Sequence, residues 1–89
     1  MLDTSKKTGG SVEKLIDEIE NAGKHMTLLT LMMNLPLKIN NLEGSEKQVF
    51  VLYYMKQSSI KMIMDITNLD EDTVIKTLNT ATKKIIDMF

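Results

Sequence analysis

The chain has 89 residues, enough for one small domain built around a single core. Hydrophobic residues make up 43% of the chain and charged residues 26%, as in ordinary globular proteins, and the formal net charge of −1 gives no overall attraction to nucleic acid or acidic membranes. The lack of cysteine excludes a disulfide scaffold and a thiolate metal site.

The N-terminal part predicts an arm followed by a helix. Residues 1–10 are polar and end in two glycines, so we expect a disordered N-terminal arm, followed by one helical domain over residues 11–89. Ser11 is a suitable N-cap for a helix whose apolar residues recur at helical spacing: Val12, Leu15, Ile16 and Ile19. Gly23 then either kinks one long helix or caps the first helix before a second begins at about Lys24.

Residues 26–35 have almost no polar face. A helix that is apolar nearly all round must be buried on more than one side, which predicts a central helix or a self-association surface. We therefore expect residues 11–35 to form an N-terminal helical and dimerisation segment, and the chain to form a symmetric homodimer. The residues expected in that interface are Leu28, Leu31, Met32 and Leu35.

A connector separates this segment from the second half of the chain. Pro36 is expected to end the helix, so that residues 36–44 form a connector with Asn40-Asn41 as its turn. Ser45 and Gln48 fit a capping box, which predicts a new helix that runs to about Lys56.

Two further helices are predicted over residues 59–67 and 71–89, joined by a turn at residues 68–70. Asn68 tolerates the left-handed conformation of such a turn, and Asp70 is a suitable N-cap for the last helix. The last helix carries a clean apolar stripe, namely Val74, Leu78, Ala81, Ile85 and Met88, and we expect Leu52, Ile63, Leu69, Val74, Leu78 and Ala81 to be packed together. The fold is therefore predicted to be all-α with four to five helices, an N-terminal helical segment and a C-terminal helix-turn-helix module at residues 45–89.

Residues 42–85 resemble the fourth conserved region of bacterial sigma factors and the small phage and mobile-element transcription regulators built on the same module. The residues that carry the resemblance follow the family's order without a gap: Leu52, Tyr54, Ser59, Ile63, Ile66, Leu69, Thr73, Val74, Leu78, Ala81 and Ile85. The resemblance implies promoter DNA binding, with the last helix in the major groove.

The chain also departs from that family's pattern. Met64 stands where the family usually has a small alanine, and Ile75, Thr77 and Thr80 stand where it usually has lysine or arginine. Glu71 and Asp72 lie at the end of the helix that is normally nearest the bases. All 11 basic residues are lysine, which suits phosphate contact better than bidentate reading of guanine.

The candidate DNA-binding residues lie mainly on the polar side of the last helix. They are Thr73, Lys76, Asn79, Thr80, Lys83 and Lys84, with Lys47 and Lys61 as possible clamps on the DNA backbone. Asn79 is suited to read adenine, and the threonines can bond either phosphate or base. The alternative interpretation is that the lysines form an ordinary solvated helix face.

Two functional hypotheses follow. We favour a DNA-binding transcription regulator of sigma-like type, from a phage or mobile element, that acts on double-stranded DNA as a dimer. The alternative is a degenerate helix-turn-helix that binds and inhibits a regulator, RNA polymerase or another host protein without binding DNA. Ile75, Ile86 and Phe89 favour this second hypothesis, because they add apolar surface where a DNA-binding protein would be basic.

No enzyme motif is present in the sequence. His25 is the only histidine, and the acidic run at residues 70–72 lacks the spacing of a calcium loop. We therefore expect no enzymatic activity, no cofactor and no metal. No signal peptide or apolar stretch of bilayer length is visible either, so we expect a cytoplasmic protein without a membrane segment.

Overall fold

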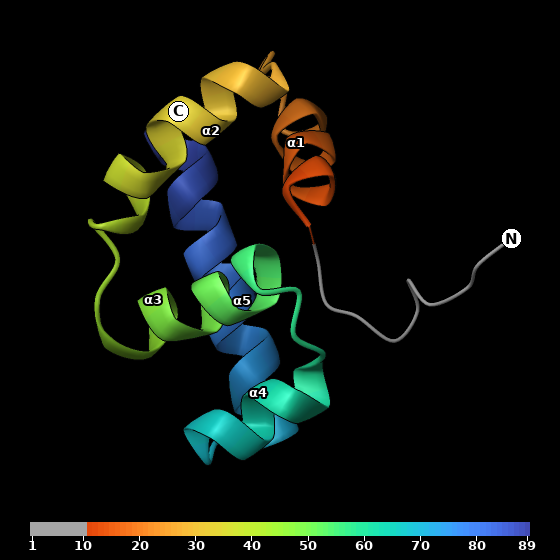
Figure 1. Cartoon of the computed structure of the whole chain (residues 1–89), viewed down its shortest axis with the longest axis vertical. Helices are drawn as coiled ribbons and strands as arrows, with labels where there is room; N and C mark the ends of the chain where they lie inside the picture. The colour runs from red at the N-terminus through yellow and green to blue at the C-terminus, as the bar shows by residue number, and fades with distance from the viewer. Residues whose placement is uncertain (1–10) are drawn as a thin grey trace, which may run out of the picture.

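The computed structural model describes residues 11–89, and these form an all-α fold with no strand among them (Figure 1). The five α-helices and one π-helical segment are α1 (Val12–Asn21), α2 (Leu28–Ile39), α3 (Gly44–Phe50), η2 (Val51–Met55), α4 (Ile60–Thr67) and α5 (Glu71–Met88). The predicted fold class is therefore confirmed. The arm predicted at residues 1–10 lies outside the described residues.

Helix α5 is the central element of the fold, with contacts to α2, α3 and α4 (Figure 1). Its predicted stripe is confirmed at Val74, Leu78, Ala81 and Ile85, which are all buried, whereas Met88 at its end is half-buried. Of the other residues expected in the core, Ile63 is buried, whereas Leu52 and Leu69 are half-buried at its edge. Of the two alternatives for residues 26–35, the central helix is wrong, since α2 lies at the outside and buries only one side; the self-association surface stays a prediction.

The first two helices are separate. Ser11 caps α1 as predicted, its hydroxyl accepting a 3.2 Å hydrogen bond from the Lys14 backbone N–H. The chain then turns at Gly23, whose φ of +88° is in the region that glycine adopts without strain. The second helix begins only at Leu28, with Thr27 as its N-cap, so the start predicted at about Lys24 is too early.

Pro36 does not end the second helix, contrary to prediction. Helix α2 continues through it to Ile39, and the Asn40 backbone N–H donates to the Pro36 carbonyl at 3.2 Å. Proline in a helix interior costs about 3 kcal/mol. The extension brings Ile39 and Leu42 into the core, where they are 7% and 3% exposed, and their burial offsets that cost. The turn predicted at residues 40–41 is confirmed.

The third helix begins two residues earlier than predicted and without the expected capping box. Glu43 is the N-cap of α3, and no side chain bonds the free backbone N–H groups at this end. The helix then passes into η2, where the Lys56 N–H reaches back to the Val51 carbonyl at 3.0 Å. This wider turn ends at Gln57, which has a positive φ of +55°.

The predicted boundaries of the last two helices are confirmed, so that α4, the turn at residues 68–70 and α5 form a helix-turn-helix. Ser59 caps α4 by accepting a 3.2 Å bond from the Met62 N–H. Asn68 ends it in the left-handed conformation, with φ of +61°. Asp70 caps α5, its Oδ1 accepting from the Thr73 N–H at 2.9 Å.

Candidate nucleic-acid interface

One face of α5 is turned away from the core and collects most of the predicted DNA-binding residues. Because the apolar stripe of α5 packs inward, residues on the opposite side of the helix point to solvent. Six of the eight candidates are exposed on α5: Thr73, Lys76, Asn79, Thr80, Lys83 and Lys84. Lys76 and Lys83 lie on nearly the same line of the helix, about 10.5 Å apart along its axis at 1.5 Å per residue.

The first turn of α5 is acidic. Asp70, Glu71 and Asp72 are all exposed at this end of the helix. Hydrogen bonds from the Thr73 hydroxyl and backbone N–H lower the pKa of the Asp70 carboxyl, and the positive charge of Lys76 acts in the same direction. The acidic turn therefore opposes close approach of phosphates at this end of α5.

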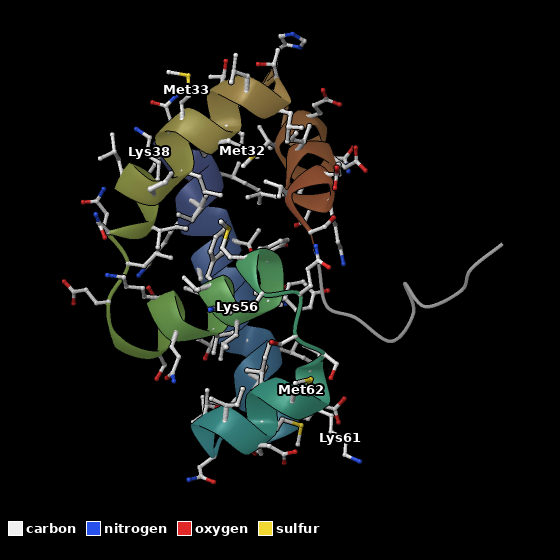
Figure 2. All side chains as sticks on the ribbon, in the orientation of Figure 1. Met32, Met33, Lys38, Lys56, Lys61 and Met62 are labelled. Atoms are coloured by element: carbon white, nitrogen blue, oxygen red, sulfur yellow. The ribbon has the colours of Figure 1, made fainter. Side chains whose placement is uncertain are left out.

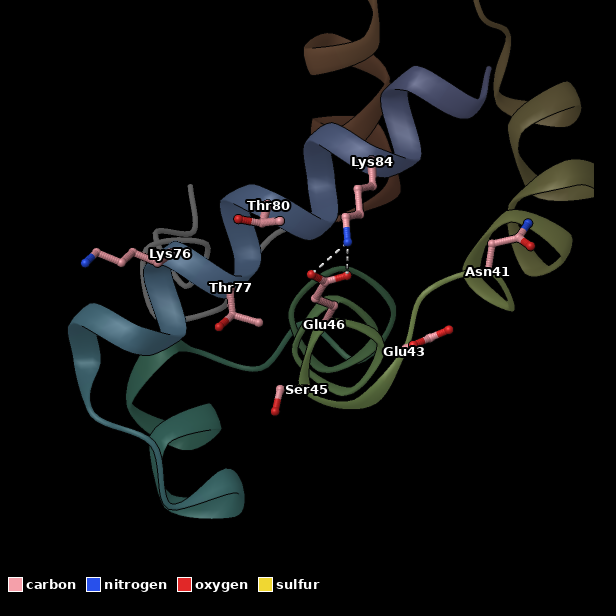
Figure 3. Close-up of a pocket in the computed structure, with 8 residues that line it drawn as sticks. All are labelled: Asn41, Glu43, Ser45, Glu46, Lys76, Thr77, Thr80 and Lys84. Atoms are coloured by element: carbon pink, nitrogen blue, oxygen red, sulfur yellow. Dashed lines mark hydrogen bonds and ion pairs between the residues drawn. The ribbon is translucent and has the colours of Figure 1, made fainter.

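Lys84 has a partner within the chain. Its ammonium lies 2.9 Å from Oε1 and 3.0 Å from Oε2 of Glu46, which joins α5 to α3 (Figure 3). This is the only ion pair among residues 11–89. The Glu46 carboxylate neutralises the charge of Lys84, whereas Lys76 and Lys83 form no ion pair within residues 11–89.

A polar cavity of about 620 Å³ lies beside this ion pair, between α5 and the start of α3 (Figure 3). Its lining residues are Asn41, Glu43, Ser45, Glu46, Lys76, Thr77, Thr80 and Lys84. The two lysines and two glutamates balance in charge, so the cavity has no strong preference for an anion.

The two predicted backbone clamps do not join the α5 face. The Lys47 ammonium donates to the Asn40 side-chain oxygen at 3.4 Å, toward the end of α2. Lys61 is exposed on α4, at the end of the molecule where α5 begins (Figure 2).

The predicted protein-interface residues fall into three groups. Leu31 and Leu35 are 0% and 1% exposed, so they belong to the chain's own core and are corrected from interface to core residues. Ile86 and Phe89 are half-buried against that core, and the Ile86 carbonyl accepts a 2.8 Å bond from the Lys24 ammonium. The exposed members of the set are Leu28, Met32 and Ile75.

Other large apolar side chains are exposed but were not predicted. Leu29, Met33 and Leu37 are exposed on α2, and Met62 and Ile66 on α4. Leu37 was missed because Pro36 was expected to end the helix before it. The others recur at a spacing of four residues within their helices, which marks an apolar row but does not show whether that row is buried or exposed.

Within residues 11–89, no cluster of three or more His, Asp and Glu side chains is arranged to hold a metal ion. None of the helices in this range combines the length and the apolar content needed to cross a membrane. Comparison with protein-family models, curated proteins and solved structures finds no match to the chain.

Proposed function

We propose that this chain is a sigma-like, helix-turn-helix transcription regulator that binds double-stranded DNA through the exposed face of α5. The observation that carries the proposal is the gathering of Lys76, Asn79, Thr80 and Lys83 on one solvent-facing side of the second helix of a helix-turn-helix. Lysine neutralises phosphate, while threonine and asparagine bond phosphates or base edges, so one helix offers both kinds of contact.

The distribution of charge suggests how the helix would lie on DNA. The acidic first turn at residues 70–72 disfavours the usual approach, in which the N-terminal end of the recognition helix enters deepest. Lys76 and Lys83 favour contact through the middle of α5 instead, with Asn79 between them to face the bases. Binding of this kind depends mainly on phosphate contacts, so it should be modest in affinity and sensitive to salt.

The test is fluorescence anisotropy of a labelled AT-rich duplex titrated with the full chain at about 0.1 M salt. Loss of one phosphate contact should weaken binding roughly eightfold at this salt concentration. We expect that effect from Lys76→Ala and from Lys83→Ala. Lys56→Ala is the matched control, because Lys56 is also exposed but follows η2 and is not part of α5 (Figure 2). Equal effects from all three variants would contradict the proposal.

A second candidate function is binding to another protein through the helix-turn-helix end, with inhibition of a regulator or RNA polymerase. The observation that favours it is the exposure of Met62, Ile66 and Ile75, three large apolar residues on α4 and α5. Under this hypothesis, Ile75→Asp abolishes capture of purified RNA polymerase while the variant keeps the helical circular dichroism of the parent. Tight duplex binding that Ile75→Asp leaves unchanged would count against it.

A further inference from the structure

Helix α2 has four rows of residues spaced four apart, and only one of the four rows is polar. The polar row consists of Thr30, Asn34 and Lys38. The three apolar rows are Leu28-Met32-Pro36, Leu29-Met33-Leu37 and Leu31-Leu35-Ile39. A helix at the surface of a monomer normally buries its apolar rows and exposes its polar ones, so this helix has more apolar surface than one contact can cover.

The fold buries only one of these apolar rows. Leu31, Leu35 and Ile39 pack into the core, while the other two rows face solvent. Their exposed fractions are high: Leu28 43%, Leu29 70%, Met32 53%, Met33 68% and Leu37 64%. Five such side chains exposed together on one helix form an apolar patch of the kind that marks an interaction site. We call these five residues the α2 face.

We propose that the α2 face is a homodimer interface, in which α2 of one chain packs against α2 of a second copy. This inference concerns a different surface from the DNA-binding proposal and does not rest on it. The proposed interface also differs from the one expected from the sequence: it contains Leu29, Met33 and Leu37, and it does not contain Leu31 and Leu35.

The charge of α2 favours a second copy over a charged partner. Lys38 is the only charged residue in the helix, and its ammonium lies 5.7 Å from the centre of the Phe89 ring, on the polar row. The α2 face itself carries no charge. Two copies can therefore pack there without repulsion between like charges. An acidic or basic partner would have no opposite charge on the α2 face with which to form an ion pair.

The spacing of the face also suits self-pairing. Rows of residues four apart form ridges, and two helices that interdigitate such ridges cross at about −50°, the commonest helix packing. Leu29 and Leu37 lie four residues before and after Met33, so a two-fold axis beside Met33 would bring each leucine toward the other copy's α2. An isologous interface uses the same patch on both copies, and the row Leu29-Met33-Leu37 can serve as that patch.

A stable dimer buries about 800 Å² on each partner. The neighbouring residues at the start of the helix, including Thr27 and Thr30, are exposed and would form the polar rim. Figure 2 shows Met32 and Met33 at one end of the molecule and Met62 on α4 at the other. A dimer through α2 would therefore leave the helix-turn-helix of each copy free.

The test is sedimentation velocity of the full chain from about 1 to 200 µM, with paired methionine variants. Met32 and Met62 are both 53% exposed, so Met32→Lys and Met62→Lys place the same charge on equally exposed positions. We expect the parent chain and Met62→Lys to dimerise, and Met32→Lys to raise the dimer dissociation constant at least tenfold with unchanged helical circular dichroism. A monomeric parent chain at 200 µM, or equal weakening by both variants, would overturn the proposal.

A cross-linking experiment tests the same interface without relying on a disruptive charge. The chain has no cysteine, so Met33→Cys introduces a unique thiol close to the proposed two-fold axis. We expect this variant to form a disulfide-linked dimer under mild oxidation, whereas Met62→Cys, at the α4 end, should not. Equal cross-linking of the two variants would mean that copies collide at random, which would overturn the proposal.

Discussion

The Tyr54 hydroxyl donates a 2.7 Å hydrogen bond to Oε2 of Glu18 and so joins η2 to α1. The Tyr54 side chain is buried, with its ring centre 4.8 Å from that of Phe50. The Thr82 hydroxyl of α5 lies 3.5 Å from the same tyrosine oxygen. One buried phenol thus links the N-terminal helix to the helix-turn-helix half of the chain.

This link should contribute measurably to stability. A hydrogen bond to a charged group is worth about 1.5–3 kcal/mol, and we expect Tyr54→Phe to lower the free energy of unfolding by that amount. Tyr53→Phe is the matched control, because it removes a 2.9 Å bond to Lys14 that lies at the exposed surface. Urea denaturation followed by circular dichroism measures the free energy of unfolding of both variants. A loss from Tyr53→Phe as large as that from Tyr54→Phe would contradict this account.

Stability should also fall at high pH through Tyr54. Burial is the largest cause that raises the pKa of Tyr54 above the ordinary value of about 10, and the hydrogen bond to Glu18 acts in the same direction. The folded state therefore favours the neutral phenol. The contribution of Tyr54 to the free energy of unfolding is fully present below pH 10. It is lost as the pH rises above 10, because the unfolded chain then releases the phenol proton more readily than the folded chain does. Urea denaturation at pH 8 and pH 10.5 should show a larger loss for the parent chain than for Tyr54→Phe. An equal loss in both would exclude Tyr54 as the cause.

The core of α5 should be sensitive to truncation. Leu78 is 8% exposed and lies in the buried stripe of the helix. We expect Leu78→Ala to cost about 2–5 kcal/mol, a large part of the stability of so small a domain. Ile75→Ala, one turn earlier at an exposed position, should cost less than about 1 kcal/mol. Chemical denaturation measures the free energy of unfolding of both variants. A larger loss from Ile75→Ala than from Leu78→Ala would contradict the assignment of the buried stripe.

The parts of the fold that the sequence predicted are those governed by short-range rules. The caps at Ser11 and Asp70 each depend on a bond to a residue three positions on, and the stripe of α5 depends on helical spacing alone. The end of α2 was misjudged because the local effect of Pro36 is outweighed by burial of Ile39, a tertiary effect.

The surfaces were harder to predict than the helices. Three rows of α2 are apolar, and nothing in the sequence distinguishes the row that the core covers from the two that it leaves exposed. The ion pair between Lys84 and Glu46 joins residues 38 positions apart, so local spacing could not reveal it. As a result, the sequence placed Lys84 in the DNA-binding set without the partner that neutralises it.

Release of Lys84 should therefore strengthen DNA binding. Glu46→Gln leaves the Lys84 ammonium without its carboxylate and should tighten duplex binding several-fold. Glu43→Gln is the matched control, because Glu43 lines the same cavity and its neutralisation removes the same charge without freeing a lysine. Anisotropy titrations of both variants, and of Glu46→Gln combined with Lys84→Ala, should show a gain that depends on Lys84. If the gain in duplex affinity persisted when Glu46→Gln is combined with Lys84→Ala, it would come from the lost negative charge and not from the release of Lys84.

The salt dependence of duplex binding tests the role of α5 most directly. Each phosphate contact contributes about −0.9 to the slope of log K against log salt, so Lys76 and Lys83 predict about −1.8 for one chain and about −3.6 for a dimer on one duplex. The measurement is a series of anisotropy titrations from 50 to 200 mM salt with the parent chain, Lys76→Ala and Lys83→Ala. The DNA-binding account predicts that each substitution flattens the slope by about 0.9 for each bound chain. Undetectable binding at 50 mM salt, or a slope that neither substitution changes, would contradict it.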